Sequence, residues 1–227
     1  GTSMGMVGTL KSMLDDDGKE ALAAWVETAY GPVWEYISTR PAPALSEAER
    51  LLAPQVWNML LQNGNRPDER AAMTAKAKAF LGIGAPADPT AIAAEDLSTA
   101  ISIGVEEGGM EFYNGAIDFV RTSENQTERA TILSALASNG STDIAADLFK
   151  LSLGDDISGN ELYTIYHGLL GNSEARPVMW PMIKDNFANI VAKIPSIRKP
   201  QSAGVAGYFC TAEEVADAKT FFDSQAD

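Results

Sequence analysis

Residues 158–193 read SGNELYTIYHGLLGNSEARPVMWPMIKDNFANIVAK, and this stretch decides the fold class of the chain. Residues 158–170 repeat apolar side chains at the spacing of one helix face. Gly171-Asn172 interrupts this pattern, and residues 176–194 predict a second helix with prolines in its first turns. Two amphipathic helices with a short connector between them favour an antiparallel helical hairpin.

The rest of the chain repeats this pattern, whereas the alternating spacing typical of β-strands is almost absent. Capping boxes begin two of the helices, at Ser46-x-x-Glu49 and at Thr211-x-x-Glu214. Further predicted helices cover residues 17–29, 46–62, 68–81, 89–105, 109–122, 125–138, 141–153 and 211–222, with a break at Gly31-Pro32 and a short turn or helix at 33–37.

The predicted fold class is all-α, an α-solenoid of degenerate HEAT-like antiparallel helical hairpins. The connectors are short, so consecutive helices should be antiparallel neighbours. The hairpins recur roughly every 33 residues from Pro89 onward, as expected for stacked repeats. A closed, irregular helical bundle is the alternative architecture.

The length of 227 residues suits one large domain or two small ones. The opening GTSMG combines small residues with an internal methionine, so residues 1–9 are predicted to be an expression scar or a disordered start. Residues 10–227 are predicted to form a single helical-repeat domain.

The charge of the chain limits the partners it can have. It carries 31 acidic and 17 basic residues, a formal net charge of −14. This charge argues against nucleic acid or an anionic membrane surface as partner, because both are polyanions. It favours basic peptides through long-range attraction, although an acidic surface also serves solubility alone.

Cys210 is the only cysteine, so no intramolecular disulfide can form within the chain. This favours a reducing compartment, and no apolar run approaches the roughly 18 residues of a membrane span, so a cytoplasmic location is expected. Cys210 ends the apolar run 205–210 and is interpreted as a small buried hydrophobe rather than a catalytic thiol.

Four motifs follow one another in the second half of the chain, before the block 207–222, GYFCTAEEVADAKTFF. They are LSALASNG at 133–140, LSLGDDI at 151–157, NSEAR at 172–176 and WPMIKDNF at 180–187. In this order and spacing they resemble the C-terminal helical domain of the large zinc aminopeptidases, the group of aminopeptidase N, the puromycin-sensitive aminopeptidase and the endoplasmic-reticulum aminopeptidases. Pro181 departs from the family's tryptophan-containing helix and predicts a bend near the start of that helix.

The resemblance implies a non-catalytic domain that caps the active-site chamber of a zinc-dependent aminopeptidase and gates or contacts its peptide substrates. The implied partners are those peptides and the catalytic domain of the same polypeptide, which would hold the zinc. Residues 10–227 would then be an excised part of a larger C-terminal domain, inactive by itself. The alternative is a stand-alone helical-repeat module that binds peptides or proteins. An H-E-x-x-H motif upstream in the same reading frame would decide between them.

His167 is the only histidine, whereas an H-E-x-x-H site needs two imidazoles one helical turn apart. No catalytic, cofactor-binding or metal-ligating residue is therefore expected in this chain. Residues 108–112, GGMEF, superficially resemble the family's G-x-M-E-N motif for the substrate amine. They open a predicted helix, and Phe112 stands in place of the asparagine. Glu111 is therefore interpreted as a first-turn carboxylate that the helix dipole favours.

His167 lies among apolar neighbours in mid-helix and is interpreted as packed and locally hydrogen-bonded; the alternative places it on a concave face that meets peptide. Trp57 and Trp180 are interpreted as core anchors. Trp180 and Phe187 lie two turns apart on one side of their helix and are predicted to be buried. Closure of the C-terminal end of the stack is predicted to involve Phe209, Phe221 and Phe222.

Overall fold

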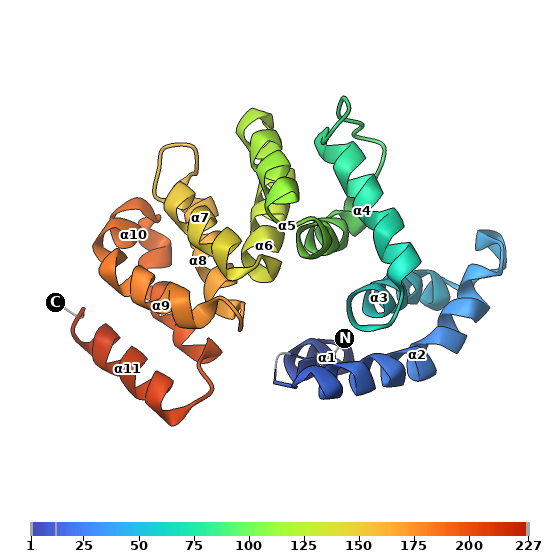
Figure 1. Cartoon of the computed structure of the whole chain (residues 1–227), viewed down its shortest axis with the longest axis horizontal. Coiled ribbons are helices and arrows are strands. Elements are labelled where there is room, and N and C mark those ends of the chain that lie inside the picture. Colours follow the sequence, from blue (N-terminus) through green and yellow to red (C-terminus); the bar gives the residue numbers. More distant parts are fainter. Residues whose placement is uncertain (1, 12, 226–227) are drawn as a thin grey trace.

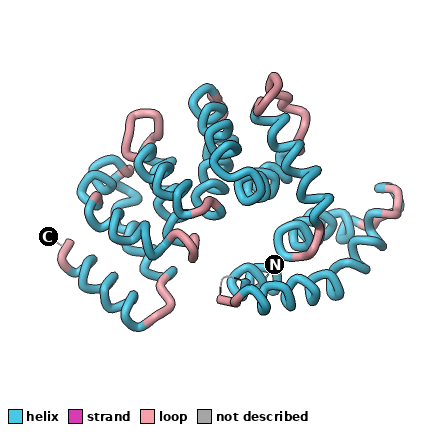
Figure 2. Tube along the Cα trace, viewed as in Figure 1, coloured by secondary structure: helices cyan, strands magenta, loops and turns pink. Residues whose placement is uncertain are grey.

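The computed structural model describes residues 2–11 and 13–225, and these residues form an all-α structure without strands (Figure 2). The α-helices are α1 (Thr2–Lys11), α2 (Asp16–Ser38), α3 (Glu47–Asn63), α4 (Pro67–Leu81), α5 (Leu97–Thr122), α6 (Gln126–Asn139), α7 (Thr142–Ser152), α8 (Gly159–Gly171), α9 (Arg176–Asp185), α10 (Phe187–Lys193) and α11 (Ala212–Asp223). The 3-10 helices are η1 (Ala42–Ala44), η2 (Ala94–Asp96) and η3 (Ser196–Tyr208). The all-α prediction is confirmed.

The helices follow one another along an arc, from α1–α3 at one end to α11 at the other (Figure 1). Neighbours in the chain are neighbours in space, since α4 packs on α5, α5 on α6, and α6 on both α7 and α8. The two ends of the arc stay apart in this view. This arrangement fits an α-solenoid better than a closed bundle.

Polar side-chain contacts between successive hairpins recur at similar separations in sequence. The separations are 39 residues for Glu27–Arg66, 36 for Arg70–Glu106, 34 for Tyr113–Asp147, 32 for Arg129–Glu161 and 37 for Trp180–Asp217. Stacked repeats of one hairpin each produce such an offset, and it lies close to the period of roughly 33 residues predicted from the sequence.

The helix termini follow the local signals in the sequence. Ser46 and Thr211 each accept a hydrogen bond from the backbone N–H three residues on, and their own backbone N–H groups donate to the carboxylates of Glu49 and Glu214. Pro67 occupies the first turn of α4, where its missing N–H costs no helical hydrogen bond. Gly82 ends α4 with φ of 77°, a left-handed conformation that glycine adopts without strain. The two predicted capping boxes are thus confirmed.

The hydrophobic core is divided into two clusters. The larger extends from Leu61 to Ala218 and holds the helices from α4 onward together. The smaller joins α1, α2 and α3 through Val7, Val26, Val56, Met59 and Leu60. Helix α1 differs from the predicted disordered start at residues 1–9: its described part is helical, and the Val7 side chain is buried.

Helix α2 continues through Gly31-Pro32, where the sequence predicted a break. Pro32 removes one backbone donor, but its ring lies on the exposed side of the helix. Val26 and Ile37, on either side of it, are both buried. Burial on both sides of Pro32 therefore outweighs the local cost of the proline.

Two other predicted boundaries were wrong. Helix α5 begins at Leu97 rather than at residue 89, because the Asp88 carboxylate accepts hydrogen bonds from Thr90 N–H and Oγ1–H and so stabilises a turn. The single helix predicted for 176–194 is broken at Asn186, which has φ −110° and ψ 10°. Asn186 Nδ2 donates to the Met182 carbonyl oxygen at 2.8 Å, so a carbonyl near the break stays paired. The bend thus falls after Pro181, not near the helix start.

Helix α5 is kinked at Gly109, between the two helices predicted at 89–105 and 109–122. Gly109 has φ 53° and ψ −141°, a conformation that residues with a Cβ rarely adopt, and no atom lies within 4 Å of a Cβ built there. We expect Gly109→Ala to lower the free energy of unfolding by about 1–3 kcal/mol through backbone strain alone. Chemical denaturation followed by circular dichroism measures this loss.

Gly204→Ala is the matched control for the kink. A Cβ at Gly204 also meets no atom within 4 Å, but its φ is not positive. At such a position alanine usually stabilises a protein by about 0.4–1 kcal/mol. Equal denaturation midpoints for the two variants would show that Gly109 is unstrained.

Candidate functional site

A pocket of about 420 Å³ opens where α6, α8 and the end of η3 meet. Gly168 makes this arrangement possible, because a Cβ there would lie 2.6 Å from the Ala137 Cβ. Small residues at both positions therefore let α8 approach α6 closely. The residues that line the pocket are Ser134, Ser138, Tyr163, Thr164, His167, Gly168, Gly171 and Tyr208.

Helix α8 positions His167 by burying its opposite face. Leu162, Ile165 and Leu169 are fully buried in the core, and the Tyr166 hydroxyl donates to the Ser202 carbonyl oxygen at 3.0 Å. The remaining side of the helix presents Tyr163 and His167 to the pocket.

Aromatic rings surround the imidazole. Its ring centroid lies 4.5 Å from that of Tyr163, 5.5 Å from that of Tyr166 and 6.1 Å from that of Tyr208. Tyr163 and His167 are one helical turn apart on α8, whereas Tyr208 comes from the end of η3. The pocket therefore combines flat apolar walls with the hydroxyls of serine, threonine and tyrosine side chains.

The surroundings of His167 favour the neutral form of its imidazole. Burial, followed by the positive charge of Arg198, lowers the pKa of His167 below its usual value of about 6.5. Arg198 itself stacks over the Tyr163 ring, 4.9 Å from its centroid. No carboxylate is among the described residues that line this pocket. Within the described structure, His167 Nε2 is buried and has no hydrogen-bond partner.

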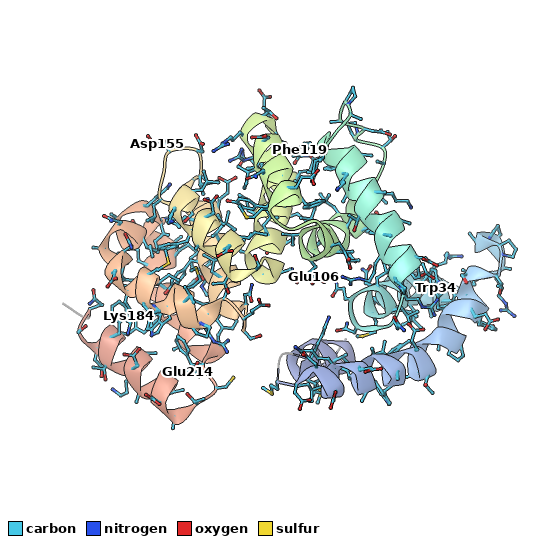
Figure 3. All side chains as sticks on the ribbon, in the orientation of Figure 1. Trp34, Glu106, Phe119, Asp155, Lys184 and Glu214 are labelled. Atoms are coloured by element: carbon cyan, nitrogen blue, oxygen red, sulfur yellow. The ribbon has the colours of Figure 1, made fainter. Side chains whose placement is uncertain are left out.

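A larger hollow of about 710 Å³ adjoins the His167 pocket and shares Ser138 and Gly171 with it. Its other walls come from α1, the start of α2, Glu106 of α5 and the segment after α8. Glu106 lies on the inner side of the arc (Figure 3). Lys11 crosses toward α3, where its ammonium donates to the Gln62 carbonyl oxygen at 2.7 Å, and burial lowers its pKa. The two hollows therefore share part of their walls at Ser138 and Gly171.

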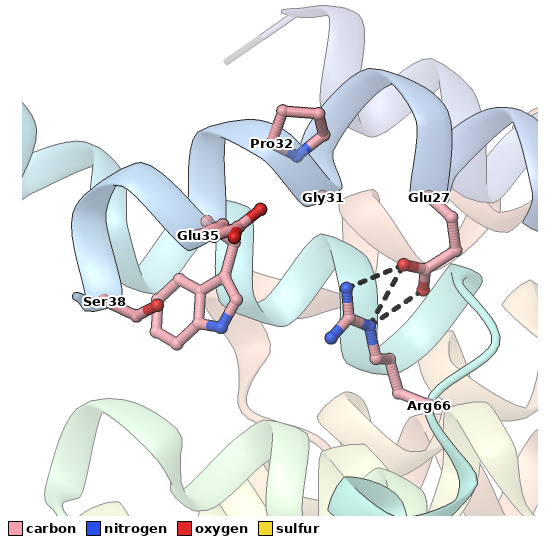
Figure 4. A pocket seen from close by; sticks show the side chains of 7 residues that line it. Glu27, Gly31, Pro32, Glu35, Ser38 and Arg66 are labelled. Carbon is pink, nitrogen blue, oxygen red and sulfur yellow. Dashed lines mark hydrogen bonds and ion pairs between the residues drawn. The ribbon is translucent and has the colours of Figure 1, made fainter.

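A third pocket, of about 470 Å³, lies beside α2, and an ion pair forms part of its lining. Arg66 Nη2 lies 2.7 Å from Glu27 Oε2, and Arg66 Nε also donates to the same carboxylate (Figure 4). Trp34 on its wall stacks on Trp57, with 4.5 Å between ring centroids. The two charged groups pair with each other and so link α2 to the α3–α4 connector. Neither of them is left free to bind a ligand, so we do not consider this pocket a binding site.

The structure places the other residues singled out from the sequence as follows. Glu111 is exposed just after the kink at Gly109, and Phe112 is buried against Gly104 and Gly108. Trp180 and Phe187 are buried, as predicted, and Trp57 is half-buried. No group of three or more histidine, cysteine, aspartate or glutamate side chains in the described part of the chain is arranged to hold a metal ion.

Cys210 was predicted to be buried, and this was wrong: its thiol is exposed. Val205 and Phe209 take the inward positions of this segment. Cys210 directly precedes the N-cap Thr211, and its backbone N–H donates to Glu214 Oε2 at 3.2 Å. The capping interaction therefore turns its side chain outward.

Comparison with known families supplies an identification. The family model of the ERAP1-like C-terminal domain matches residues 2–227. A search of curated protein sequences returned no match. Among the described helices, none is both long and apolar enough to cross a membrane. Since the match covers nearly the whole chain, the chain belongs to the family of ERAP1-like C-terminal domains.

Proposed function

We propose that this domain closes the active-site chamber of a zinc-dependent aminopeptidase and gates or contacts its peptide substrates. Family membership gives a role as the C-terminal domain of an aminopeptidase, which implies a catalytic domain in the same polypeptide. The observation that supports the finer proposal is the pair of adjoining hollows, the His167 pocket and the larger hollow, which share Ser138 and Gly171. A concave helical surface of this kind suits extended peptides, and closing a chamber keeps folded proteins and bulk water away from the reaction.

The test compares the parent polypeptide, intact and without residues 2–227, on two substrates. One substrate is a single-residue aminoacyl reporter and the other a peptide of about ten residues. Loss of the domain should change the ratio of the two kcat/KM values by about tenfold, equivalent to about 1.4 kcal/mol of differential binding. Retained hydrolysis of the reporter shows that the catalytic domain is still folded. An unchanged ratio would contradict gating and substrate contact, and would favour a stand-alone binding module.

We expect the chain of 227 residues to be inactive alone. It has a single histidine, so a two-histidine zinc site cannot be assembled from it. Hydrolysis of an aminoacyl reporter should remain at the buffer rate after zinc is added. Metal analysis that finds one tightly bound zinc per chain would contradict this expectation.

A cytoplasmic location is part of the same proposal. Cys210 is a free and exposed thiol, and such thiols persist most readily in reducing compartments.

A further inference from the structure

His167 lies within the contact that holds η3 against α8. The Tyr166 hydroxyl, beside it on α8, donates to the Ser202 carbonyl oxygen at 3.0 Å. The imidazole centroid lies 4.5 Å from that of Tyr163 and 6.1 Å from that of Tyr208 in η3. The α8–η3 contact consists of Tyr163, Tyr166 and His167 on α8 and of Gln201, Ser202 and Tyr208 on η3.

A protonated imidazole finds no partner in this contact. His167 Nε2 is buried and makes no hydrogen bond within the described structure. In a neutral imidazole only one of the two nitrogens carries a proton, whereas in an imidazolium both do. Protonation therefore leaves a buried N–H that shares a positive charge and has no acceptor, which costs far more free energy than burying the neutral ring.

None of the described groups that face the imidazole is negatively charged. They are Tyr163 and Tyr166 of α8, Arg198 and Tyr208 of η3, and Ser134 and Ser138 of α6. Aromatic rings attract cations, but the Tyr163 ring already carries the Arg198 guanidinium, 4.9 Å from its centroid. A second cation on that ring is repelled by the first and gains less than its desolvation costs.

We propose that His167 makes the α8–η3 contact sensitive to acid. The neutral imidazole packs among the tyrosine rings, whereas the imidazolium turns out into solvent through the pocket that it lines, and η3 (Ser196–Tyr208) then separates from α8. Because η3 also packs on α11, the C-terminal end of the solenoid loosens with it. The inference is independent of the proposed function, since it concerns the stability of this chain alone.

The direction of the pH dependence follows from the pKa of His167. Burial, followed by the positive charge of Arg198, holds this pKa below its usual value of about 6.5. When η3 separates, the imidazole meets water, so it takes up its proton at a higher pH than in the intact contact. The contact is therefore at full strength above about pH 6.5 and weakens as the pH falls from there through the lower pKa of the intact state.

The first test measures the proton uptake of His167 directly. Because His167 is the only histidine, its Hε1 proton gives one imidazole resonance that needs no assignment. A pH titration should give a lower midpoint for the folded chain than for the same chain unfolded in concentrated urea. An equal or higher midpoint in the folded chain would overturn the proposal.

The second test asks whether this proton loosens η3. Hydrogen exchange of peptides from residues 196–208 is measured by mass spectrometry at about pH 7.5 and about pH 5 and corrected for the intrinsic rate. Protection should fall at the lower pH, by up to about tenfold for each pH unit between the two midpoints of the first test. Peptides from α4, on the far side of α5 and α6 in the arc (Figure 1), should keep their protection. Unchanged protection of η3, or an equal loss in α4, would overturn the proposal.

Three variants tie the effect to the imidazole and to its charged neighbour. His167→Phe keeps a ring that cannot take up a proton, so η3 should show the same protection at both pH values, whatever the stability of the variant at neutral pH. Arg198→Gln removes the positive charge that faces the imidazole and should raise the Hε1 midpoint. Lys199→Gln changes the neighbouring exposed charge and is the matched control, which should raise the midpoint less. A fall in η3 protection in His167→Phe as large as in the unsubstituted chain, or equal midpoints in Arg198→Gln and Lys199→Gln, would overturn the proposal.

Discussion

The Arg129→Met variant is expected to lose about 3–5 kcal/mol of unfolding free energy, the usual cost of removing one partner from a buried ion pair. Arg129 Nε lies 2.6 Å from Glu161 Oε1, and only 10% and 5% of these two side chains are exposed. The guanidinium also donates to the carbonyl oxygens of Val120 and Asp156. The substitution therefore leaves a buried carboxylate and two carbonyls without their donor. Urea denaturation followed by circular dichroism measures the loss.

Arg121→Met is the matched control, because Arg121 also pairs with the next hairpin. Its Nε lies 3.2 Å from Asp156 Oδ2, but the side chain is 48% exposed. An exposed pair of this kind contributes about 0–1 kcal/mol. Equal denaturation midpoints for Arg121→Met and Arg129→Met would contradict a stabilising role for the buried pair.

A double variant separates the unpaired charge from the lost packing. Adding Glu161→Gln to Arg129→Met removes the stranded negative charge, while glutamine can still accept from the Ser158 N–H in the capping box at the start of α8. The double variant should therefore be more stable than Arg129→Met alone. If it is less stable, the carboxylate in Arg129→Met has found another partner or water.

The pair also makes stability depend on pH. Burial alone would raise the pKa of the Glu161 carboxyl, but hydrogen bonds from Arg129 and Ser158 outweigh it and hold the pKa below its usual value. The unfolded chain thus takes up this proton at a higher pH than the folded chain. The stabilisation that the ionised Glu161 carboxylate contributes is complete above about pH 4.3, the usual pKa of glutamate in an unfolded chain. It is lost as the pH falls through the lower pKa of the folded state. Between pH 6 and 3, the unfolding free energy of Arg129→Met should fall less steeply than that of the unsubstituted chain.

The helices could be predicted from sequence wherever a local signal fixes them. The capping boxes at Ser46 and Thr211 and the first-turn Pro67 each depend on residues within one turn, so no tertiary information is needed. Ser158-x-x-Glu161 carries the same signal and caps α8, although the sequence interpretation did not use it. The failures at Pro32 and Cys210 have the opposite cause. Packing overrides the break signal of Gly31-Pro32, and a capping contact overrides the apolar pattern at Cys210.

The site was harder to predict because its residues come from separate segments. His167 alone attracted notice, and the structure packs its imidazole against the rings of Tyr163 and Tyr166 at the edge of the pocket. Ser138 and Tyr208 carry no signal of their own and meet it only through the packing of α6, α8 and η3. Arg129 and Glu161 likewise resemble ordinary surface charges in the sequence, and a separation of 32 residues hides their pairing.

Trp180→Ala is the second substitution with a large expected effect, about 3–5 kcal/mol for deleting a buried aromatic side chain. Trp180 is 7% exposed, and its ring centroid lies 5.1 Å from that of Phe209 and 5.2 Å from that of Phe221. Its indole Nε1 donates to Asp217 Oδ2 at 2.6 Å. The side chain thus joins α9 to α11 by both packing and a hydrogen bond.

Two further variants serve as references for the loss of unfolding free energy in Trp180→Ala. Trp25→Ala removes an indole that is 52% exposed and should change the unfolding free energy by no more than about 0.5 kcal/mol. Trp180→Phe keeps a ring but loses the donor to Asp217, so its cost should fall between the two alanine variants. Equal denaturation midpoints for Trp180→Ala and Trp25→Ala would show that the C-terminal end does not depend on this ring.

The loss should be local before it is global, because few side chains of α11 are buried and Trp180 contacts several of its residues. Ala218 is the only fully buried residue of α11, and the half-buried Phe221 and Phe222 both pack on Trp180. Removing the indole should therefore let α11 detach at a lower free energy than the rest of the core. Trypsin under native conditions should then cut after Lys219 faster in Trp180→Ala than in Trp25→Ala. Equal cleavage rates at Lys219 would mean that α11 detaches only when the whole chain unfolds.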